Sequence, residues 1–422
     1  MRKILALFVL CVPLITVSAQ TSLQEITETP QKSGGVLYAY PFKGENYTAP
    51  PKGYEAFYIS HFGRHGSRYL INNDEYKWPL ELLESASAAR ALTPLGEDVL
   101  GRLKQVWEEA RGRGGDLSPL GVRQHRGIAE RMYNSYPQIF DSNLDISARS
   151  TLVTRCILSM DAFCERLKEL NPGLNISRNA SHRHMPDICP PYSPEAETFR
   201  SAKDTWREEY RKFEESHIKP ERLVNSLFSD KTFITEKVNP SALMKALGEI
   251  AGSVQNMEVN VSFYDIFTTE ELFDIWQCKN YHNYVVDGPS SKSAGATIRM
   301  INPLLKDIMD KADDVIQSKG KGATLRFGHD GNLIPLLALM HVQNCYESIS
   351  NTTDFYKVWS NFKTVPMASN IQIVFYRKSG SDDILVKFLH NEKEVLITPV
   401  KSDIPPFYKW KDVENFYSGL LK

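Results

Sequence analysis

The segment Arg64-His65-Gly66-Ser67-Arg68 gathers two arginines, a histidine and a glycine within five residues. Arginine presents a rigid fork of N–H donors, which suits the oxygens of a bound tetrahedral dianion. Because Gly66 permits a tight turn, the backbone and the imidazole can approach the same bound group closely. With this composition, RHGxR would occur by accident only about two times in a thousand, so the pattern favours an anion-binding site over a basic surface loop.

Two later segments carry groups of the same kinds. The stretch ARSTLVTRCILSMDAF holds Arg149 and Arg155, and we expect Arg155 to contact the anion while Arg149 has a structural role. His329 and Asp330 open a predicted helix, whose first amide groups and dipole favour an anion. There the histidine can donate a hydrogen bond and the acid can protonate a reacting group, although an ordinary helix N-cap is the alternative.

The remaining histidines of interest fall into two groups. The cluster His182-Arg183-His184 could bind outlying phosphates of a polyanionic substrate, or it could be a solvated loop. Packed or surface positions are the stronger interpretation for three isolated histidines, which are His61, His125 and His341.

Each reactive segment follows a predicted strand. The run EAFYIS at 55–60 is aromatic and β-branched, and it leads directly into the RHGSR turn. Comparable runs at 144–148 and 323–327 precede Arg149 and His329, respectively. Ligands of α/β sheets bind at the carboxyl ends of the strands, so we expect the three segments to meet at one rim.

Helical patterns alternate with these strands. Two of the predicted helices open with Thr/Ser-Pro-Leu-Gly, and we expect both to pack on the sheet; the helices cover 93–111, 118–136 and 151–170. Further strands are predicted at 371–376 and 384–397, and the second of these runs turns at Asn391-Glu392 to form an antiparallel pair. The pattern predicts an α/β fold with a three-layer core, in which helices flank a mainly parallel sheet.

A change in composition suggests a second domain. From about residue 190 to residue 275 the chain is charged and helical, with little β-branched alternation. We therefore predict an inserted α-helical cap domain at 186–285. The α/β core would then consist of 20–185 and 286–422.

The amino terminus has the pattern of a secretory signal. Two cations precede an apolar run that ends in the small-residue sequence Val17-Ser18-Ala19, so we expect cleavage after residue 19 and a mature chain of 422 − 19 = 403 residues. The apolar run is short for a spanning helix, and no other segment predicts a membrane span. We expect a periplasmic or secreted protein.

The charge balance limits the partners of the mature protein. Lys plus Arg number 50 against 51 for Asp plus Glu, so no global basic field exists to hold nucleic acid. Five cysteines remain after removal of the signal, which allows one or two disulfides and leaves at least one thiol unpaired. Their spacing lacks CxxC or CxxH pairs, so we expect no metal site. Five Asn-x-Ser/Thr sequons would matter in a glycosylating host; they begin at Asn46, Asn175, Asn179, Asn260 and Asn351.

Taken together, the segments resemble the histidine acid phosphatase family, whose fingerprint is RHGxRxP, a later arginine and a carboxyl-terminal HD. The resemblance covers most of the mature chain and includes LSPLGVRQHRGIAERMYNSYP and FLHNEKEV. The stretch around Arg155 and Cys156 looks most like the multiple inositol polyphosphate phosphatase branch, which includes phytase-like members. Two residues depart from these patterns. Leu70 replaces the usual proline, and His329-Asp330 replaces the HAE of that branch, as in bacterial phytases and sugar phosphatases of the family.

The resemblance implies an enzyme that hydrolyses phosphomonoesters without a cofactor. His65 would attack phosphorus to give a phosphohistidine, and Asp330 would protonate the leaving alkoxide. The phosphate would be bound by Arg64, Arg68, Arg155 and His329. Inositol phosphates are the first expectation for the substrate. The alternatives are an acid sugar phosphatase acting on compounds such as glucose 1-phosphate and a non-catalytic exported protein that binds phosphate or glycans.

Overall fold

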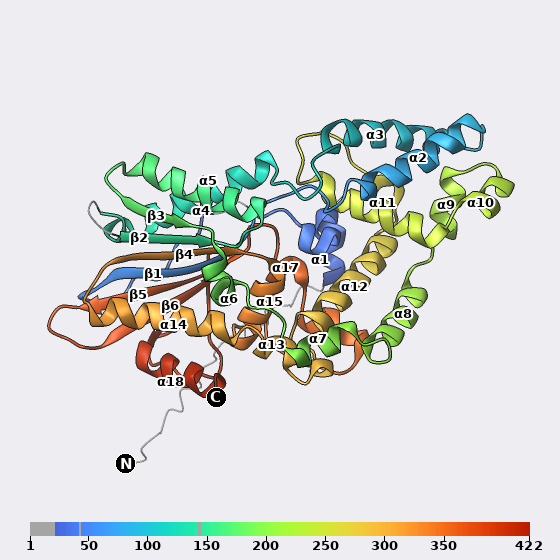
Figure 1. Cartoon of the computed structure of the whole chain (residues 1–422). Coiled ribbons are helices and arrows are strands. Elements are labelled where there is room, and N and C mark those ends of the chain that lie inside the picture. The colour runs from blue at the N-terminus through green and yellow to red at the C-terminus, as the bar shows by residue number, and fades with distance from the viewer. Residues whose placement is uncertain (1–21, 42–43, 142–144) are drawn as a thin grey trace, which may run out of the picture.

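The computed structural model describes residues 22–41, 44–141 and 145–422, so the predicted signal at 1–19 lies outside the described residues. Its centre is an eight-stranded sheet in the order β3-β2-β4-β1-β5-β6-β7, with β8 also paired to β6 (Figure 1). The strands are β1 (Tyr54–Arg64), β2 (Asp145–Ser150), β3 (Asn175–Asn179), β4 (Gly322–Gly328), β5 (Asn370–Lys378), β6 (Ile384–His390), β7 (Lys393–Val395) and β8 (Phe407–Lys409).

The strand directions make the sheet mixed but mainly parallel. β1, β2, β3 and β4 are mutually parallel neighbours, whereas β5 runs antiparallel to β1 and β6 runs antiparallel to β5. The predicted turn between β6 and β7 is confirmed, because Asn391 and Glu392 both have positive φ, as a two-residue hairpin turn of this kind requires. The predicted fold class, an α/β fold with helices flanking a mainly parallel sheet, is confirmed.

Helices cover both faces of the sheet (Figure 1). On one face, α4 and α5 bury Ile128, Met132 and Phe163 against Ile59 and Leu325 of the sheet. The opposite face forms a separate apolar cluster with the later helices of the chain. The helices of the two layers are α4 (Pro119–Ser135) and α5 (Thr154–Leu170), then α14 (Asn302–Gln317), α15 (Asp330–Leu339) and α18 (Trp410–Leu420).

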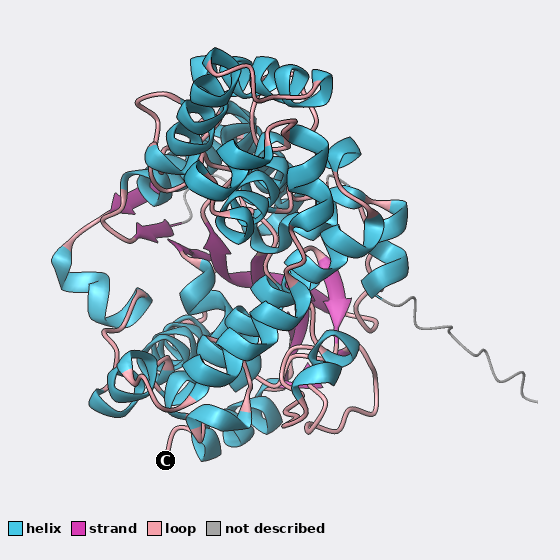
Figure 2. Cartoon of the chain, turned by 90° about the vertical axis from the view of Figure 1, so that its right-hand side faces the viewer, coloured by secondary structure: helices cyan, strands magenta, loops and turns pink. Residues whose placement is uncertain are grey.

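Most of the remaining helices form a lobe beside the sheet, and in the view of Figure 2 they lie in front of the strands. Its longer members are α2 (Asp74–Ala88), α3 (Pro94–Ala110), α8 (Trp206–His217), α11 (Pro240–Val254) and α12 (Thr269–Val286). Shorter helices are α1 (Ser22–Glu28), α7 (Pro194–Ser201), α9 (Glu221–Leu227) and α10 (Lys231–Lys237) in the first part of the chain, then α13 (Ala296–Arg299), α16 (Phe355–Val358) and α17 (Asn361–Thr364).

The expectation that both Thr/Ser-Pro-Leu-Gly helices pack on the sheet is wrong for α3. Leu100 and Leu103 of this helix share an apolar cluster with Leu223 and Leu227 of α9. The Thr93 hydroxyl, which caps α3, also donates to the carbonyl of Ser226 at 2.6 Å. An amphipathic pattern shows that a helix has a buried face but does not identify the element that covers it. α2 and α3 therefore pack with helices of the predicted cap, and the division of the chain at 186 and 285 stays a prediction.

Candidate active site

The carboxyl ends of β1, β2 and β4 meet at one edge of the sheet. Arg64 ends β1 opposite Gly328 of β4, and Ser150 of β2 lies opposite Phe327. The bonds continue past the strand ends, since the His65 amide donates to Gly328 O at 2.9 Å and Thr151 donates to Phe327 O at 3.0 Å. The RHGSR turn and the segments at 149–155 and 329–330 therefore converge, as the strand pattern predicts.

Arg64 is fixed in position by its neighbours. Its side chain is fully buried, and Nη1 donates to Val36 O at 2.6 Å and to Val365 O at 2.7 Å. Nη2 lies 3.0 Å from Oδ2 of Asp330, which joins the first and third reactive segments in one ion pair. Hydrogen bonds to two carbonyls and the ion pair with a carboxylate hold the guanidinium in one orientation.

Several guanidinium donors at this edge have no partner among the described residues. The Nε–H groups of Arg64, Arg68 and Arg155 are buried and unbonded. Arg68 Nη1 donates to Tyr69 O at 2.7 Å, and Arg155 makes only a long contact of 3.4 Å with Gly115 O. Buried donors without acceptors are unfavourable, so an anion that accepted from them would remove that cost.

The His65 imidazole has a defined tautomer. Its Nδ1 lies 2.9 Å from Gly66 O, and a carbonyl can only accept, so Nδ1 carries the proton. Burial first, and then the positive charges of Arg64, Arg68 and Arg155, hold the pKa of His65 well below its usual value. The ring is therefore neutral near pH 7, and Nε2 has a free lone pair.

His329 lies beside this imidazole, and Asp330 pairs with Arg64. The His329 ring centre is 5.7 Å from that of His65, and its Nε2 is 3.2 Å from the Thr151 hydroxyl. Burial and the Arg155 charge lower the pKa of His329 to about 4. For Asp330, burial acts to raise the pKa, but Arg64 and Arg68 outweigh it, so the pKa is lowered and the free enzyme holds a carboxylate.

Polar side chains from three other segments hold the catalytic turn, and the sequence patterns did not single them out. Ser159 Oγ accepts from the Gly66 amide at 3.1 Å, and Gln124 Oε1 accepts from the Ser67 amide at 2.8 Å. The Ser67 hydroxyl donates to Asn256 Oδ1 at 2.6 Å. Ser159 and Gln124 lie inside the stretches that carry the family resemblance, whereas Asn256 follows α11 and has no local motif that could reveal it.

Leu70, the departure from RHGxRxP, uses a donor that proline lacks. Its amide donates to the Tyr76 hydroxyl at 2.9 Å, and that hydroxyl lies 2.7 Å from Ser253 Oγ in α11. Proline has no N–H, so this link to Tyr76 would be absent with the residue that the family usually has. The loop exit is thereby tied to the helical lobe.

The glycine of the Ser-Pro-Leu-Gly motif is needed for close packing against the catalytic turn. A Cβ on Gly121 would lie 2.4 Å from Ser67 O, whereas one on Gly101 of α3 would meet nothing within 4 Å. We expect Gly121→Ala to lower the free energy of unfolding by about 2–4 kcal/mol and to reduce activity, because the turn must shift. Gly101→Ala, the matched control, should be neutral or stabilising by up to about 1 kcal/mol. Urea denaturation of both variants checks this, and equal stabilities would contradict it.

The other site candidates lie apart from this group. Arg149 pairs with Asp307 at 3.2 Å, and Arg326 contacts the same carboxylate at 2.7 Å, so Arg149 has the structural role expected of it. His182, Arg183 and His184 form the short helix η3 after β3, and the contact shown for His184 is to Asp187 at 4.0 Å. Their predicted contact with remote phosphates stays a prediction.

His61 and His125 are packed, as predicted, and they make stability depend on pH. Both are buried, and burial lowers each pKa to about 3. The unfolded chain binds these protons below about pH 6.5 and the folded chain does not, so their stabilising effect is complete above pH 6.5 and declines as the pH falls toward 3.

We expect these two histidines to reduce the free energy of unfolding by roughly 2–3 kcal/mol between pH 5.5 and 4.5. Urea denaturation at several pH values measures this slope. His61→Leu/His125→Leu should flatten it relative to wild type. His182→Gln is the control and should change it little, since the His182 side chain is exposed. An unchanged slope in the double variant would contradict the assignment.

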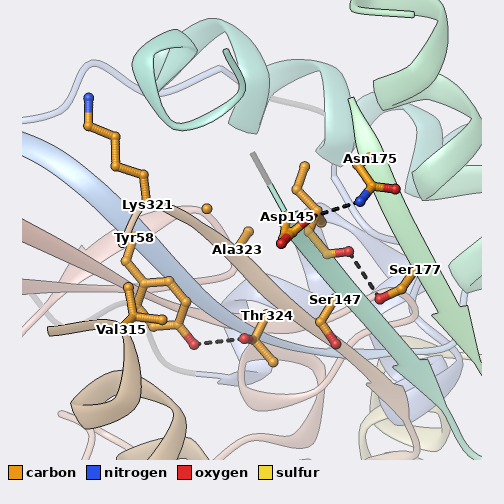
Figure 3. Close-up of a pocket in the computed structure, with 11 residues that line it drawn as sticks. Tyr58, Asp145, Ser147, Asn175, Ser177, Val315, Lys321, Ala323 and Thr324 are labelled. Carbon is orange, nitrogen blue, oxygen red and sulfur yellow. Dashed lines mark hydrogen bonds between the residues drawn. The ribbon is translucent and has the colours of Figure 1, made fainter. Parts of the chain in front are cut away.

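Two cavities were found away from these side chains. One, of about 420 Å³, lies at the amino ends of β2 and β4, and Figure 3 shows Tyr58, Asp145 and Thr324 in its lining. The other, of about 890 Å³, lies between the amino-terminal segment and residues 343–366. Neither contains the reactive histidines or arginines.

Two further sequence predictions concern disulfides and membrane-spanning helices. All five cysteines are free thiols, so no disulfide joins the described residues; they are Cys156, Cys164, Cys189, Cys278 and Cys345. Among the described helices, none combines the length and apolarity needed to cross a bilayer.

Comparison with known proteins identifies the family to which the chain belongs. The pattern of the histidine phosphatase superfamily, branch 2, matches residues 63–391, which includes the RHGSR turn and the His329-Asp330 segment. The chain therefore belongs to this superfamily, as a phosphatase of the histidine acid phosphatase type.

Individual relatives lie within the same group. Multiple inositol polyphosphate phosphatase 1 of Gallus gallus is 23% identical over 383 residues, which cover 85% of this chain and 80% of the relative. The Bifidobacterium longum multiple inositol polyphosphate phosphatase, solved with inositol hexasulfate, has a TM-score of 0.75 at 18% identity, over 92% of this chain and 97% of that one. The phytase from D. castellii has a TM-score of 0.68 at 16% identity, over 93% and 85%.

Proposed function

We propose that the protein is an exported, phytase-like phosphomonoesterase that acts through a covalent phosphohistidine on His65. The observation that carries the proposal is a neutral imidazole with a free Nε2, near buried guanidinium N–H groups that have no acceptor among the described residues. A phosphomonoester supplies both missing partners, because its oxygens accept hydrogen bonds and its phosphorus accepts the lone pair.

The reaction follows from the charges in the site. Arg64, Arg68, Arg155 and His329 bind the non-bridging phosphate oxygens and stabilise the charge that they carry in the transition state. Nε2 of His65 attacks phosphorus, and the bond from phosphorus to the ester oxygen breaks. The Asp330 carboxylate then takes a proton from water, whose oxygen attacks phosphorus. The bond from phosphorus to Nε2 breaks, which releases phosphate and restores the neutral ring and the acid. No step requires a cofactor.

Asp330 supplies the proton to the departing alkoxide. In the free enzyme the arginines lower the pKa of this carboxyl, so it needs a further influence to hold a proton. A bound phosphate dianion offsets the positive charge of Arg64 and Arg68, and its own negative charge raises the pKa of the partly buried acid. The proton thus becomes available when substrate is present, which is when the alkoxide must be protonated.

Inositol phosphates are the proposed substrates. Relatives from chicken and human bear the name multiple inositol polyphosphate phosphatase, and the B. longum enzyme of that name was solved with inositol hexasulfate. Export is proposed from the signal-like residues 1–19. The His182-Arg183-His184 cluster is a candidate for contacts with the outlying phosphates of such a substrate, and the helices of 186–285 are proposed to form the cap that selects it.

A sugar phosphatase is the second candidate, and one observation favours it. The acid at the second motif is Asp330, directly after His329, as in bacterial phytases and sugar phosphatases rather than in the HAE pattern. A non-catalytic phosphate- or glycan-binding protein would also bind anions among the guanidinium groups of Arg64, Arg68 and Arg155. It would not need the imidazole lone pair or the adjacent acid.

Phosphate release from phytate and from glucose 1-phosphate, measured side by side, distinguishes these candidates. We expect kcat/KM for phytate to be higher by about tenfold or more, because three arginines and the outlying cations favour a polyanion. A higher value for glucose 1-phosphate would select the sugar phosphatase. Absence of phosphate release from both would select the binding protein.

A further inference from the structure

The cavity of about 890 Å³ has a polar and aromatic lining. It does not include the catalytic nest, which is the group formed by His65, Arg64, Arg68, Arg155 and His329. The size of the cavity lies within the range of small-molecule sites in proteins. Two backbone segments connect the cavity to the catalytic arginine. The carbonyls of Val36 and Val365 bind Arg64. Val36 is two residues before Tyr38, and Val365 stands between Thr364 and Pro366, and these three neighbours line the cavity. The segments at 36–38 and 364–366 thus border both Arg64 and the cavity.

Positive charge exceeds negative charge around this cavity. Four lysines and two glutamates line it, an excess of 4 − 2 = 2; they are Lys32, Lys357, Lys363 and Lys393 with Glu25 and Glu45. Asp354, which is not in the lining, pairs with Lys357 and leaves an excess of one. His390 also lines the cavity, and burial lowers its pKa to about 4, so it adds no charge at neutral pH.

Two of the lysines, Lys32 and Lys363, lie over the aromatic ring of Phe362. The ammonium of Lys32 lies 5.5 Å from the centre of the Phe362 ring, and that of Lys363 lies 5.8 Å from it. Both pair with the single carboxylate of Glu25, whose side chain is 9% exposed. Two cations that share one buried anion leave a net positive charge in the cavity lining, beside the ring of Phe362.

Trp359 of the cavity lining carries a buried donor without an acceptor in the described part of the chain. Trp359 is 2% exposed and lines the cavity, and its indole Nε1–H has no partner among the described residues. Buried Trp N–H groups usually find an acceptor. A ligand that presented anionic oxygens would provide one while it neutralised the excess charge of the lysines.

We propose that this cavity is a second, non-catalytic site that binds a small organic polyanion. Lysine ammonium groups bind anionic oxygens as point charges without demanding one geometry, which suits a ligand with several anionic groups on a compact carbon frame. A ligand bound in this cavity would not be a substrate, because His65 is not part of the cavity lining and could not attack the ligand there. Binding here does not depend on the proposed hydrolytic function.

Calorimetric titration with inositol hexasulfate tests the proposal, because a sulfate ester is not a substrate for phosphate release. Wild type should bind two molecules per chain. Lys357→Gln/Lys363→Gln should lose one of them or weaken it at least tenfold, and both side chains are more than half exposed, so the fold should tolerate the change. The matched control Lys306→Gln/Lys311→Gln removes the same charge from α14 and should titrate like wild type.

A further variant separates the two sites. Arg68→Gln/Arg155→Gln weakens the catalytic nest and should keep the cavity site. A single site in wild type, or a cavity variant that titrates like wild type, would overturn the proposal. Loss of both molecules in the arginine variant would also overturn it. If only the cavity variant loses binding and no phosphate is ever released from phytate, the proposed function fails while the second site stands.

Discussion

His65→Ala should lower the rate of phosphate release by at least about 10⁴-fold, because the atom that bonds to phosphorus is removed. Nε2 of His65 is held as a free lone pair by the bond from Nδ1–H to Gly66 O. The ring centre of His329 lies 5.7 Å from that of His65, and Nε2 of His329 is 3.2 Å from the Thr151 hydroxyl, so His329 is placed to bind phosphate rather than to attack it. Steady-state phosphate release from phytate measures the effect.

A matched control is His341→Ala, which removes an imidazole outside the site and should leave the rate within about twofold of wild type. The His65 variant should still bind inorganic phosphate, because the guanidinium groups remain. Acid-quenched wild type should contain phosphate on histidine, and the variant should contain none. Equal rates for wild type and the His65 variant would disprove the assignment of the nucleophile.

Asp330→Asn should slow alkyl phosphate hydrolysis by about 10²–10⁴-fold, since the amide keeps the size of the side chain but cannot donate a proton as an acid does. The loss should depend on the leaving group. A nitrophenolate departs without protonation, so 4-nitrophenyl phosphate should lose much less activity than phytate. kcat for the two substrates, compared in wild type and variant, measures this difference.

Asp313→Asn serves as the control for Asp330→Asn. Asp313 accepts from the Trp410 indole at 2.9 Å, far along α14 from the reactive segments, and its replacement should affect both substrates alike and slightly. If the Asp330 variant lost the same factor on both substrates, Asp330 would act through the position of Arg64, to which it pairs, rather than as a proton donor.

The meeting of the three reactive segments at one edge could be predicted from sequence because each segment comes at or soon after the end of a strand. The register of β1, β2 and β4 is set by hydrophobic runs, so residues 64, 150 and 328 reach the same edge without further information. The position of α3 could not be predicted in this way. Its apolar stripe fits a sheet or another helix equally well, and Leu103 packs in the lobe.

The supports of the catalytic turn were hidden for a different reason. Ser159 and Gln124 are ordinary residues within helices, and Asn256 comes from a segment almost two hundred residues away from the Ser67 that it binds. A hydrogen bond of this kind depends on tertiary packing, and it leaves no periodic or local signal in the chain. The pairing of Arg149 with Asp307 is of the same type.

The bonds from Ser67 to Asn256 and from Tyr76 to Ser253 tie the reactive turn to α11 and the segment after it. A hinge that swung α11 away from the sheet would have to break both, and would carry the nucleophile's neighbours with it. The reactive turn is therefore fixed to α11 and is not expected to open and close. We expect substrate and product to pass the side chains and loops at the rim without a displacement of α11.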